Sequence, residues 1–279
     1  MDQTLIERRQ FSGGMKGKNL RYLNETPGQA QRQVRAGFVL LEHFSLPAFT
    51  QALDTLIITS NLLRAELFST RTFGLSEAEV ISDLGLVIRP DARIDLAALQ
   101  DLDLLVVCGG YRTELRASDE FISLLKAAAE RGVSLAGLWN GAWFLGRAGL
   151  LDGYRCAIHP EHRPALTEIA KTTHVSSEPY VIDRDRLTAS SPSGAFHMAL
   201  DWIKNLHGKA LVEGVEDILA FEESRYRRIK PDENICVSAP LREVVKLMDA
   251  NLEEPLELEQ LAVYAGRSRR QLERLFKEQ

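Results

Sequence analysis

The cysteines are the side chains of this sequence best suited to nucleophilic chemistry. There are three, Cys108, Cys156 and Cys236, widely separated and without a CxxC pair. An odd number at such spacing favours neither a disulfide framework nor a zinc site and suits a reducing compartment, so we expect no cofactor and no metal. Cys108 ends an apolar run typical of a buried strand, and Cys156 is interpreted as a small apolar side chain. Catalysis by either thiol is therefore the less favoured interpretation.

The C-terminal residues carry a second kind of chemistry, basic side chains at helical spacing. Ser268 is a natural N-cap, and Gln271 completes a capping box directly after a turn at Gly266. The expected buried stripe of this helix is Leu272, Leu275 and Phe276. Another face carries Arg270, Arg274 and Lys277. The candidate DNA contacts are Ser268, Arg269, Arg270, Gln271, Arg274 and Lys277.

A short helix over residues 256–265, the glycine turn and the helix that follows predict a helix-turn-helix. Its second helix would enter the major groove of DNA, where arginine pairs with guanine edges and lysine contacts phosphates. An amphipathic helix over residues 241–252, begun by Pro240, is expected to precede it. The alternative is an ordinary helix with solvated charges. The turn, the capping box and the apolar spacing in combination favour DNA binding.

Buried strands alternate with amphipathic helices through most of the chain. Strands are expected over residues 34–41, 70–75, 85–88 and 102–110, and helices over residues 45–63, 121–132 and 193–208. Residues 133–151 predict a strand, a sharp turn and a helix, and residues 181–190 predict a hairpin. Such a pattern predicts an α/β fold, with a parallel sheet covered by helices on both faces and a small all-α segment after it.

Length, charge and apolar content bound the domain organisation. The 279 residues carry a net charge of -5, which argues against a chain coated with nucleic acid along its length but allows a local basic surface. No apolar run approaches the ~20 residues of a membrane span, and the polar N-terminus lacks a secretory signal, so we expect a cytoplasmic protein without a membrane partner. The predicted parts are a flexible extension (1–33), a ligand-sensing domain (34–220), a linker (221–239) and a helix-turn-helix segment (240–279).

The C-terminal segment resembles the AraC/XylS family of transcriptional regulators. The matching residues are Leu256 through Ala262, Ala265-Gly266, Ser268 through Leu272, and Arg274 through Lys277. In that family the DNA-binding domain contains two helix-turn-helix units joined by a long helix. Because the sequence stops at Gln279, just after the first unit, the resemblance implies a regulator truncated at that point.

Residues 34–208 resemble the DJ-1/PfpI group of the class I glutamine amidotransferase-like superfamily. The likeness rests on the first strand and helix, on Cys108-Gly109-Gly110 and on Gly137–Ala142. It implies a flavodoxin-like fold, in which enzymes of the group place a cysteine at a strained strand-to-helix turn, the elbow, assisted by a nearby acidic residue. Here we expect Asn140 at the elbow and Ala48 at the acidic position, while His159 lies near a downstream histidine position. The resemblance therefore implies no enzyme activity.

The two resemblances in one chain are similar to the amidotransferase-like branch of the AraC family, whose members respond to arginine, carnitine, glycine betaine and related metabolites. They imply a transcriptional activator that acts as a homodimer, with DNA, RNA polymerase and a small amino-acid-like or quaternary-ammonium effector as partners. The candidate ligand-binding residues are Tyr111, Arg112, Trp139, Asn140 and His159. Arg112 would pair with a carboxylate, and Trp139 or Tyr111 would face a quaternary ammonium. Core packing of the aromatic rings and solvation of Arg112 are the alternatives.

Two further functions stay open on the sequence. One is an active DJ-1/PfpI-like hydrolase, glyoxalase-type enzyme or thiol redox sensor that uses Cys108 or Cys156. The other is an interaction module that has lost both DNA binding and ligand response. Rapid alkylation of one thiol with loss of turnover would favour the enzyme. The interaction module, in which the loss results from truncation, predicts no operator binding even when the missing C-terminal unit is restored.

Overall fold

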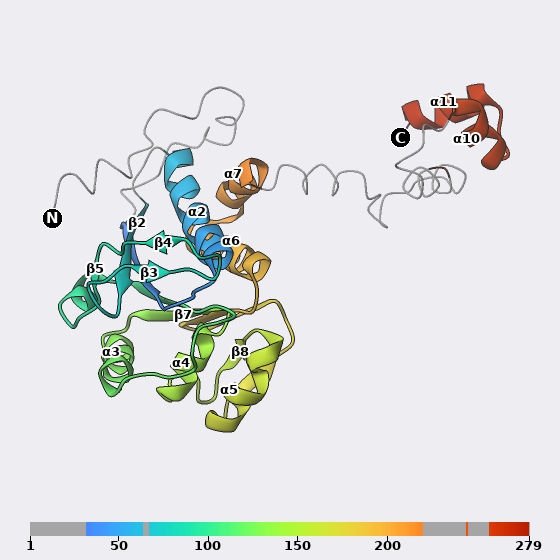
Figure 1. Ribbon diagram of the computed structural model, residues 1–279. Coiled ribbons are helices and arrows are strands. Elements are labelled where there is room, and N and C mark those ends of the chain that lie inside the picture. The colour runs from blue at the N-terminus through green and yellow to red at the C-terminus, as the bar shows by residue number, and fades with distance from the viewer. Residues whose placement is uncertain (1–31, 64–66, 220–243, 245–256, 279) are drawn as a thin grey trace. The chain divides into compact units, whose positions relative to one another are not determined.

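The computed structural model describes residues 32–63, 67–219, 244 and 257–278 (Figure 1). The chain divides into two compact units, with the boundary between residues 220 and 221. Within the described residues, no helix is both long enough and apolar enough to cross a membrane.

A seven-stranded sheet forms the centre of the first unit, in the order β10-β11-β7-β6-β1-β2-β5. Its strands are β1 (Val34–Leu40), β2 (Phe68–Gly74), β5 (Ala92–Arg93), β6 (Leu104–Cys108), β7 (Ser134–Leu138), β10 (Tyr180–Asp183) and β11 (Arg186–Ala189). Neighbouring strands are parallel, except that β10 and β11 form an antiparallel hairpin. Two small sheets lie outside it, formed by β3 (Val80–Ile81) with β4 (Val87–Ile88) and by β8 (Arg155–Ala157) with β9 (His174–Ser176).

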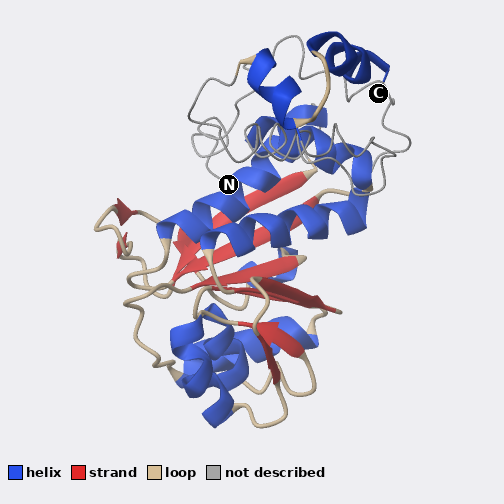
Figure 2. Cartoon of the chain, turned by 90° about the vertical axis from the view of Figure 1, so that its right-hand side faces the viewer, coloured by secondary structure: helices blue, strands red, loops and turns tan. Residues whose placement is uncertain are grey.

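Helices cover both faces of the sheet (Figures 1 and 2). One face carries α2 (Leu46–Leu63), α6 (Pro192–His207) and α7 (Lys209–Leu219), and the other carries α3 (Asp119–Glu130), α4 (Gly141–Arg147) and α5 (Arg163–Ile169). The short 3₁₀ helices are η2 (Ala98–Asp101) and η3 (Pro160–His162). The side chains of β1 alternate between the two faces of the sheet and so contribute to both cores. Phe38 and Leu40 pack on the first face, and Val39 packs on the second. The structure therefore confirms the predicted flavodoxin-like α/β fold.

Helix ends and the hairpin follow the local signals in the sequence. Gly132 and Gly208, predicted to close two helices, adopt left-handed φ values of 77° and 87° after α3 and α6. The hairpin predicted over residues 181–190 is β10–β11. The strand predicted over residues 85–88 is shorter in the structure than predicted. Only Val87 and Ile88 are extended, and they pair with β3 outside the central sheet, where Val87 is 54% exposed.

Two helices, α10 (Leu258–Tyr264) and α11 (Arg269–Glu278), are described in the second unit. Gly266 turns the chain between them with a φ of 61°, as predicted. Their shared core consists of Val244, Leu261, Ala262 and Leu272. The helix predicted over residues 241–252 lies outside the described residues, apart from Val244.

The predicted buried stripe of α11 is correct at Leu272 but wrong at Phe276. Leu272 is fully buried, Leu275 is half-buried and Phe276 is 44% exposed. Among the described residues, α10 is only seven residues long and covers the first turns of α11. Phe276, in the last turn of α11, therefore lies outside the core that the described residues of this unit form.

Candidate functional site

The strand-to-helix turn of the first unit lies between β7 and α4. Trp139 occupies the left-handed region with a φ of 61°, whereas Asn140 has a φ of -97° and caps α4. The elbow is therefore Trp139, and the expectation that Asn140 occupies it is wrong by one residue. The Trp139 amide still bonds to the Ala189 carbonyl of the neighbouring strand at 2.8 Å, so the chain must reverse direction within that single residue. An indole side chain supplies no nucleophile at this position.

Asn140 joins the elbow to the loop after β6. Its side chain is fully buried, and its Nδ2 donates a hydrogen bond to the Thr113 carbonyl at 3.2 Å. The amide fits because Gly109 has no side chain, since a methyl group there would lie 1.8 Å from Asn140 Oδ1. Asn140 Oδ1 has no hydrogen-bond partner among the described residues. The residue therefore positions the 109–113 loop against α4.

Trp139 and His159 form the centre of the elbow surface. Their rings stack with centroids 4.5 Å apart and planes inclined by 7°, and the His159 amide donates to the Trp139 carbonyl at 3.2 Å. Burial lowers the pKa of His159, the carboxylate of Glu161 opposes that shift, and the positive charge of Arg163 adds to it. Burial therefore favours the neutral form of this imidazole. Trp139 Nε1 and His159 Nδ1 are buried without a hydrogen-bond partner in the described part of the chain.

Tyr111 and Arg112 lie in the loop after β6, and both side chains are exposed to solvent. Tyr111 is 58% exposed, and the Arg112 guanidinium donates through Nη2 to the Asp83 carbonyl at 3.1 Å, beside the β3–β4 hairpin. Both residues precede Thr113, to which Asn140 bonds. Trp139, Asn140 and His159 thus lie together, while Tyr111 and Arg112 belong to the exposed loop that Asn140 anchors. Ligand binding by these five residues stays a prediction.

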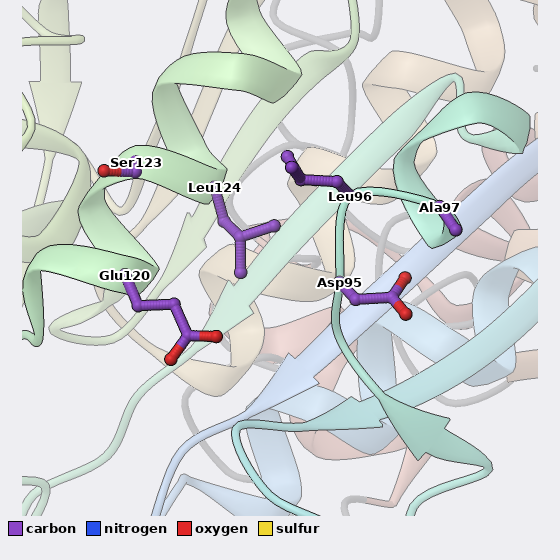
Figure 3. A pocket seen from close by; sticks show the side chains of 6 residues that line it. All are labelled: Asp95, Leu96, Ala97, Glu120, Ser123 and Leu124. Carbon is purple, nitrogen blue, oxygen red and sulfur yellow. The ribbon is translucent and has the colours of Figure 1, made fainter.

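A pocket of about 400 Å³ lies away from the elbow (Figure 3). The segment after β5 lines one side of it and α3 lines the other; the lining residues are Asp95, Leu96, Ala97, Glu120, Ser123 and Leu124. Its carboxylates are already engaged, since Asp95 accepts from the Ala98 amide at 2.8 Å and Glu120 pairs with Arg93 at 2.5 Å. The pocket includes none of the residues predicted from the sequence, and its engaged groups provide no catalytic pair.

The two described thiols are buried and unactivated. Burial raises the pKa of Cys156 to about 12 and raises the pKa of Cys108 even further above its usual range. Both side chains are therefore protonated at neutral pH. Ala48, expected at the acidic position, is fully buried in α2 and offers no acid or base. Cys236 lies outside the described residues.

The turn between α10 and α11 is held by reciprocal side-chain caps. Ser268 Oγ accepts from the Gln271 amide at 3.3 Å, and Gln271 Oε1 accepts from the Ser268 amide at 3.0 Å, which confirms the predicted capping box. A second box, formed by Glu257 and Gln260, begins α10. The sequence reasoning missed it, although the same Glu-x-x-Gln spacing was its signal. Both helices therefore start at fixed residues.

The basic residues of α11 differ in what they contact. Arg269 pairs with Glu259 of α10 at 2.7 Å and with Glu273, one turn along its own helix, at 3.1 Å. Arg270 and Arg274 are exposed, and Lys277 lies in α11 with a side chain outside the description. Arg269 thus joins the two helices, while Arg270 and Arg274 lie on an exposed face of α11. Contact of these residues with DNA stays a prediction.

The fold and the elbow define a class of protein, the flavodoxin-like domains with a sharp turn between a central strand and a covering helix. Residues 50–205 match the DJ-1/PfpI family. The chain therefore belongs to the DJ-1/PfpI family. The crystal structure of DJ-1β from Drosophila melanogaster has the same fold, with 21% sequence identity, a TM-score of 0.59 and coverage of 68% of this chain and 98% of that one.

The relatives of the chain are transcriptional regulators. It is 36% identical to the HTH-type transcriptional regulator GbdR of Pseudomonas aeruginosa, over 91% of this chain and 70% of that protein. It is 29% identical to the HTH-type transcriptional regulator CdhR of Pseudomonas aeruginosa, over 86% of this chain and 72% of that protein. The crystal structure of an AraC family transcriptional regulator from Pseudomonas putida matches with 49% identity and a TM-score of 0.64, over 67% of this chain and 99% of that one. The chain is thus a homologue of HTH-type, AraC-family regulators.

Proposed function

We propose that this chain is a cytoplasmic, sequence-specific DNA-binding activator, in which the α/β unit senses a small metabolite and the α10–α11 unit contacts the operator. The observation that carries the proposal is the relationship to HTH-type regulators over 91% of the chain. The capped turn and the exposed basic face of α11 supply a physical means of binding DNA. The protein would act as a homodimer, since paired half-sites on DNA suit a two-fold partner, and would recruit RNA polymerase.

The proposed effector is a small amino-acid-like or quaternary-ammonium metabolite bound at the elbow surface. The indole of Trp139 and the solvent-facing ring of Tyr111 offer aromatic faces to a cation, and the buried Nε1–H of Trp139, which has no partner among the described residues, suits a carboxylate. Because Trp139 fills the turn where the enzymes of this family carry their nucleophile, ligand binding there would shift a population of conformations and would not start a reaction.

DNA binding is tested by selecting sites for the full chain from a random duplex pool. We expect enrichment of a discrete sequence, and Arg270→Ala should weaken binding to it about tenfold or more if Arg270 contacts a base edge. Arg147→Ala is the matched control, because Arg147 is an exposed arginine of the α/β unit. A pool without enrichment, or equal losses for the two variants, would contradict the proposal.

Effector binding is tested by the melting temperature of the chain against arginine, carnitine, glycine betaine, dimethylglycine and neutral amino acids. A ligand at a hundredfold excess over its Kd stabilises the folded state by ~2.7 kcal/mol. One compound should raise the melting temperature selectively, and Arg112→Ala should reduce that shift while Arg116→Ala, a change at another exposed arginine, leaves it intact. No shift across the panel would remove the elbow as the effector site and leave the DNA result to stand by itself.

The enzyme alternative is tested by thiol alkylation. Because their pKa values are raised by burial, Cys108 and Cys156 should react with iodoacetamide in the folded chain far more slowly than in the urea-unfolded chain at pH 7. Peptide mass spectrometry would assign the modified residue. Fast labelling of either buried cysteine in the native protein, together with loss of a turnover activity, would favour the enzyme.

A further inference from the structure

A histidine–carboxylate cluster lies in the η3 segment, which follows β8. His159, Glu161 and His162 each direct one ligand atom into the same region, and these three atoms all lie within 4.8 Å of one another. We propose that His159, Glu161 and His162 form a binding site for a divalent first-row transition-metal ion. This site goes beyond the proposed function, which needs no metal.

The backbone of η3 explains why two histidines meet here. Pro160 begins the 3₁₀ turn, and the His162 amide closes it with a 2.9 Å hydrogen bond to the His159 carbonyl. His159 precedes the 3₁₀ helix as its N-cap and His162 ends it, and this tight turn places the two imidazole rings with their centroids 6.0 Å apart. Glu161, between them in sequence, adds the carboxylate.

One ring nitrogen of each histidine has no protein partner among the described residues. His159 Nδ1 and His162 Nε2 are buried without a hydrogen bond, which is a costly state for an imidazole nitrogen unless something else satisfies it. Nitrogen and carboxylate ligands of a zinc site lie ~2.0–2.2 Å from the ion, so tetrahedral ligand atoms are ~3.4 Å apart. The present separations all lie within 4.8 Å, so they must shorten by at most about 1.4 Å. Exposed Glu161 can move its carboxylate by side-chain rotation.

The local charges decide how tightly such a site binds. The guanidinium of Arg163 is near enough to His159 to act on its charge, and it opposes a cation. The carboxylate of Glu161, which acts on both histidines, offsets that charge. Two imidazoles and one carboxylate also leave a coordination position open. The arrangement therefore suits an exchangeable ion that can take a further ligand, and not a closed structural site.

The site is joined directly to the elbow. His159 stacks on Trp139 and bonds to its carbonyl, so any change in the orientation of the imidazole is transmitted to the left-handed residue of the turn. An ion held at η3 would fix the His159 ring and with it the Trp139 indole. Metal binding would thus set the shape of the surface that we propose for the effector.

The test is calorimetric titration of the full chain with Zn²⁺, in a Cys236→Ser background so that the third thiol does not contribute. We expect one ion per chain. His162→Gln should weaken binding at least ~tenfold, and Glu161→Gln should weaken it measurably. His174→Gln, a change at an exposed histidine outside the cluster, is the matched control and should bind as the parent does.

Two results would overturn the site. One is the absence of saturable Zn²⁺ binding at millimolar concentrations, and the other is unchanged affinity in Glu161→Gln. The second variant decides the matter even if His162→Gln is destabilised, because Glu161 is exposed and its amide isostere preserves the fold. Repeating the DNA selection with a chelator present keeps the two proposals separate, since DNA binding without metal is expected whether or not the site exists.

Discussion

At the elbow of the first unit, backbone atoms of neighbouring segments approach so closely that a methyl group does not fit between them. In the second unit, hydrogen bonds from side chains stabilise the turn between α10 and α11. A β-carbon on Gly141 would lie 2.1 Å from the Val107 carbonyl oxygen. A β-carbon on Gly266 would meet nothing within 4 Å, and the α11 start is fixed by Ser268 and Gln271 instead. The elbow thus depends on the absence of a β-carbon at Gly141, whereas the start of α11 depends on side-chain hydrogen bonds.

This difference has consequences for substitution. A substitution that adds atoms at the elbow is expected to lower stability strongly, because a clash with backbone atoms cannot be relieved by rotating a side chain. A substitution that removes a hydrogen-bonded cap is expected to lower stability less, because water replaces a lost exposed bond at modest cost. We therefore expect the elbow to show the largest effects on stability, and the helix-turn-helix to show smaller effects that appear mainly in DNA binding.

Gly141→Ala should give the largest effect. The new methyl group would overlap the Val107 carbonyl, and separating α4 from β6 should lower the free energy of unfolding of the first unit by on the order of 4 kcal/mol. Urea titration followed by circular dichroism measures the change. Gly132→Ala is the control, since Gly132 has a φ of 77° with open space around it and should cost only about 1 kcal/mol. Equal losses at the two positions would show that conformational strain, and not close approach, governs the elbow.

Leu272→Ala should come next and should act on the second unit alone. Leu272 is one of four fully described buried residues that form the core between α10 and α11. Removing a leucine side chain from a core costs ~3 kcal/mol, and a core this small has little stability in reserve. We expect DNA binding to be lost while the melting temperature of the α/β unit is unchanged. Retained DNA binding would mean that α11 is stabilised without this core.

The same contrast explains which features could be predicted from the sequence. The Ser268–Gln271 box and the Gly266 turn are local, so residue types at fixed spacing were enough to predict them. The elbow was placed one residue too late because the resemblance over Gly137–Ala142 did not identify the residue with the left-handed conformation, for which tryptophan has no preference. Only the pairing of β7 with its neighbours forces Trp139 into that region.

Contacts between distant segments were beyond the sequence for the same physical reason. The hydrogen bond from Asn140 to Thr113 joins residues of two different loops, and the sequence of neither loop predicts it. The grouping of His159, Glu161 and His162 was not predicted although these residues are neighbours, because His159 was considered alone and a 3₁₀ turn after it was not predicted. The parallel sheet, by contrast, follows from continuous apolar strands and was predicted correctly.

Ser268→Ala should produce a smaller loss than Leu272→Ala. The substitution removes the oxygen that accepts from the Gln271 amide, and loss of an N-cap costs ~1 kcal/mol of helix stability. Site-specific DNA affinity should fall severalfold, and Ser268→Asn, which restores a capping oxygen, should recover most of it. A phosphate contact by the serine hydroxyl predicts a different result, a reduced salt dependence of binding that asparagine fails to restore.

Arg269→Gln should have the smallest effect on operator binding, and Arg270→Gln is the variant to compare with it. Arg269 is committed to Glu259 and Glu273, and exposed ion pairs of this kind add little stability, so its loss should weaken operator binding only about twofold. Arg270 is exposed on the same turn, so its loss should cost about tenfold or more at one base position. Affinities of both variants for the selected site and for single-base changes in it measure this. If Arg269 were the base contact, the order would reverse, and Glu259→Gln would then strengthen binding because it releases the guanidinium from α10.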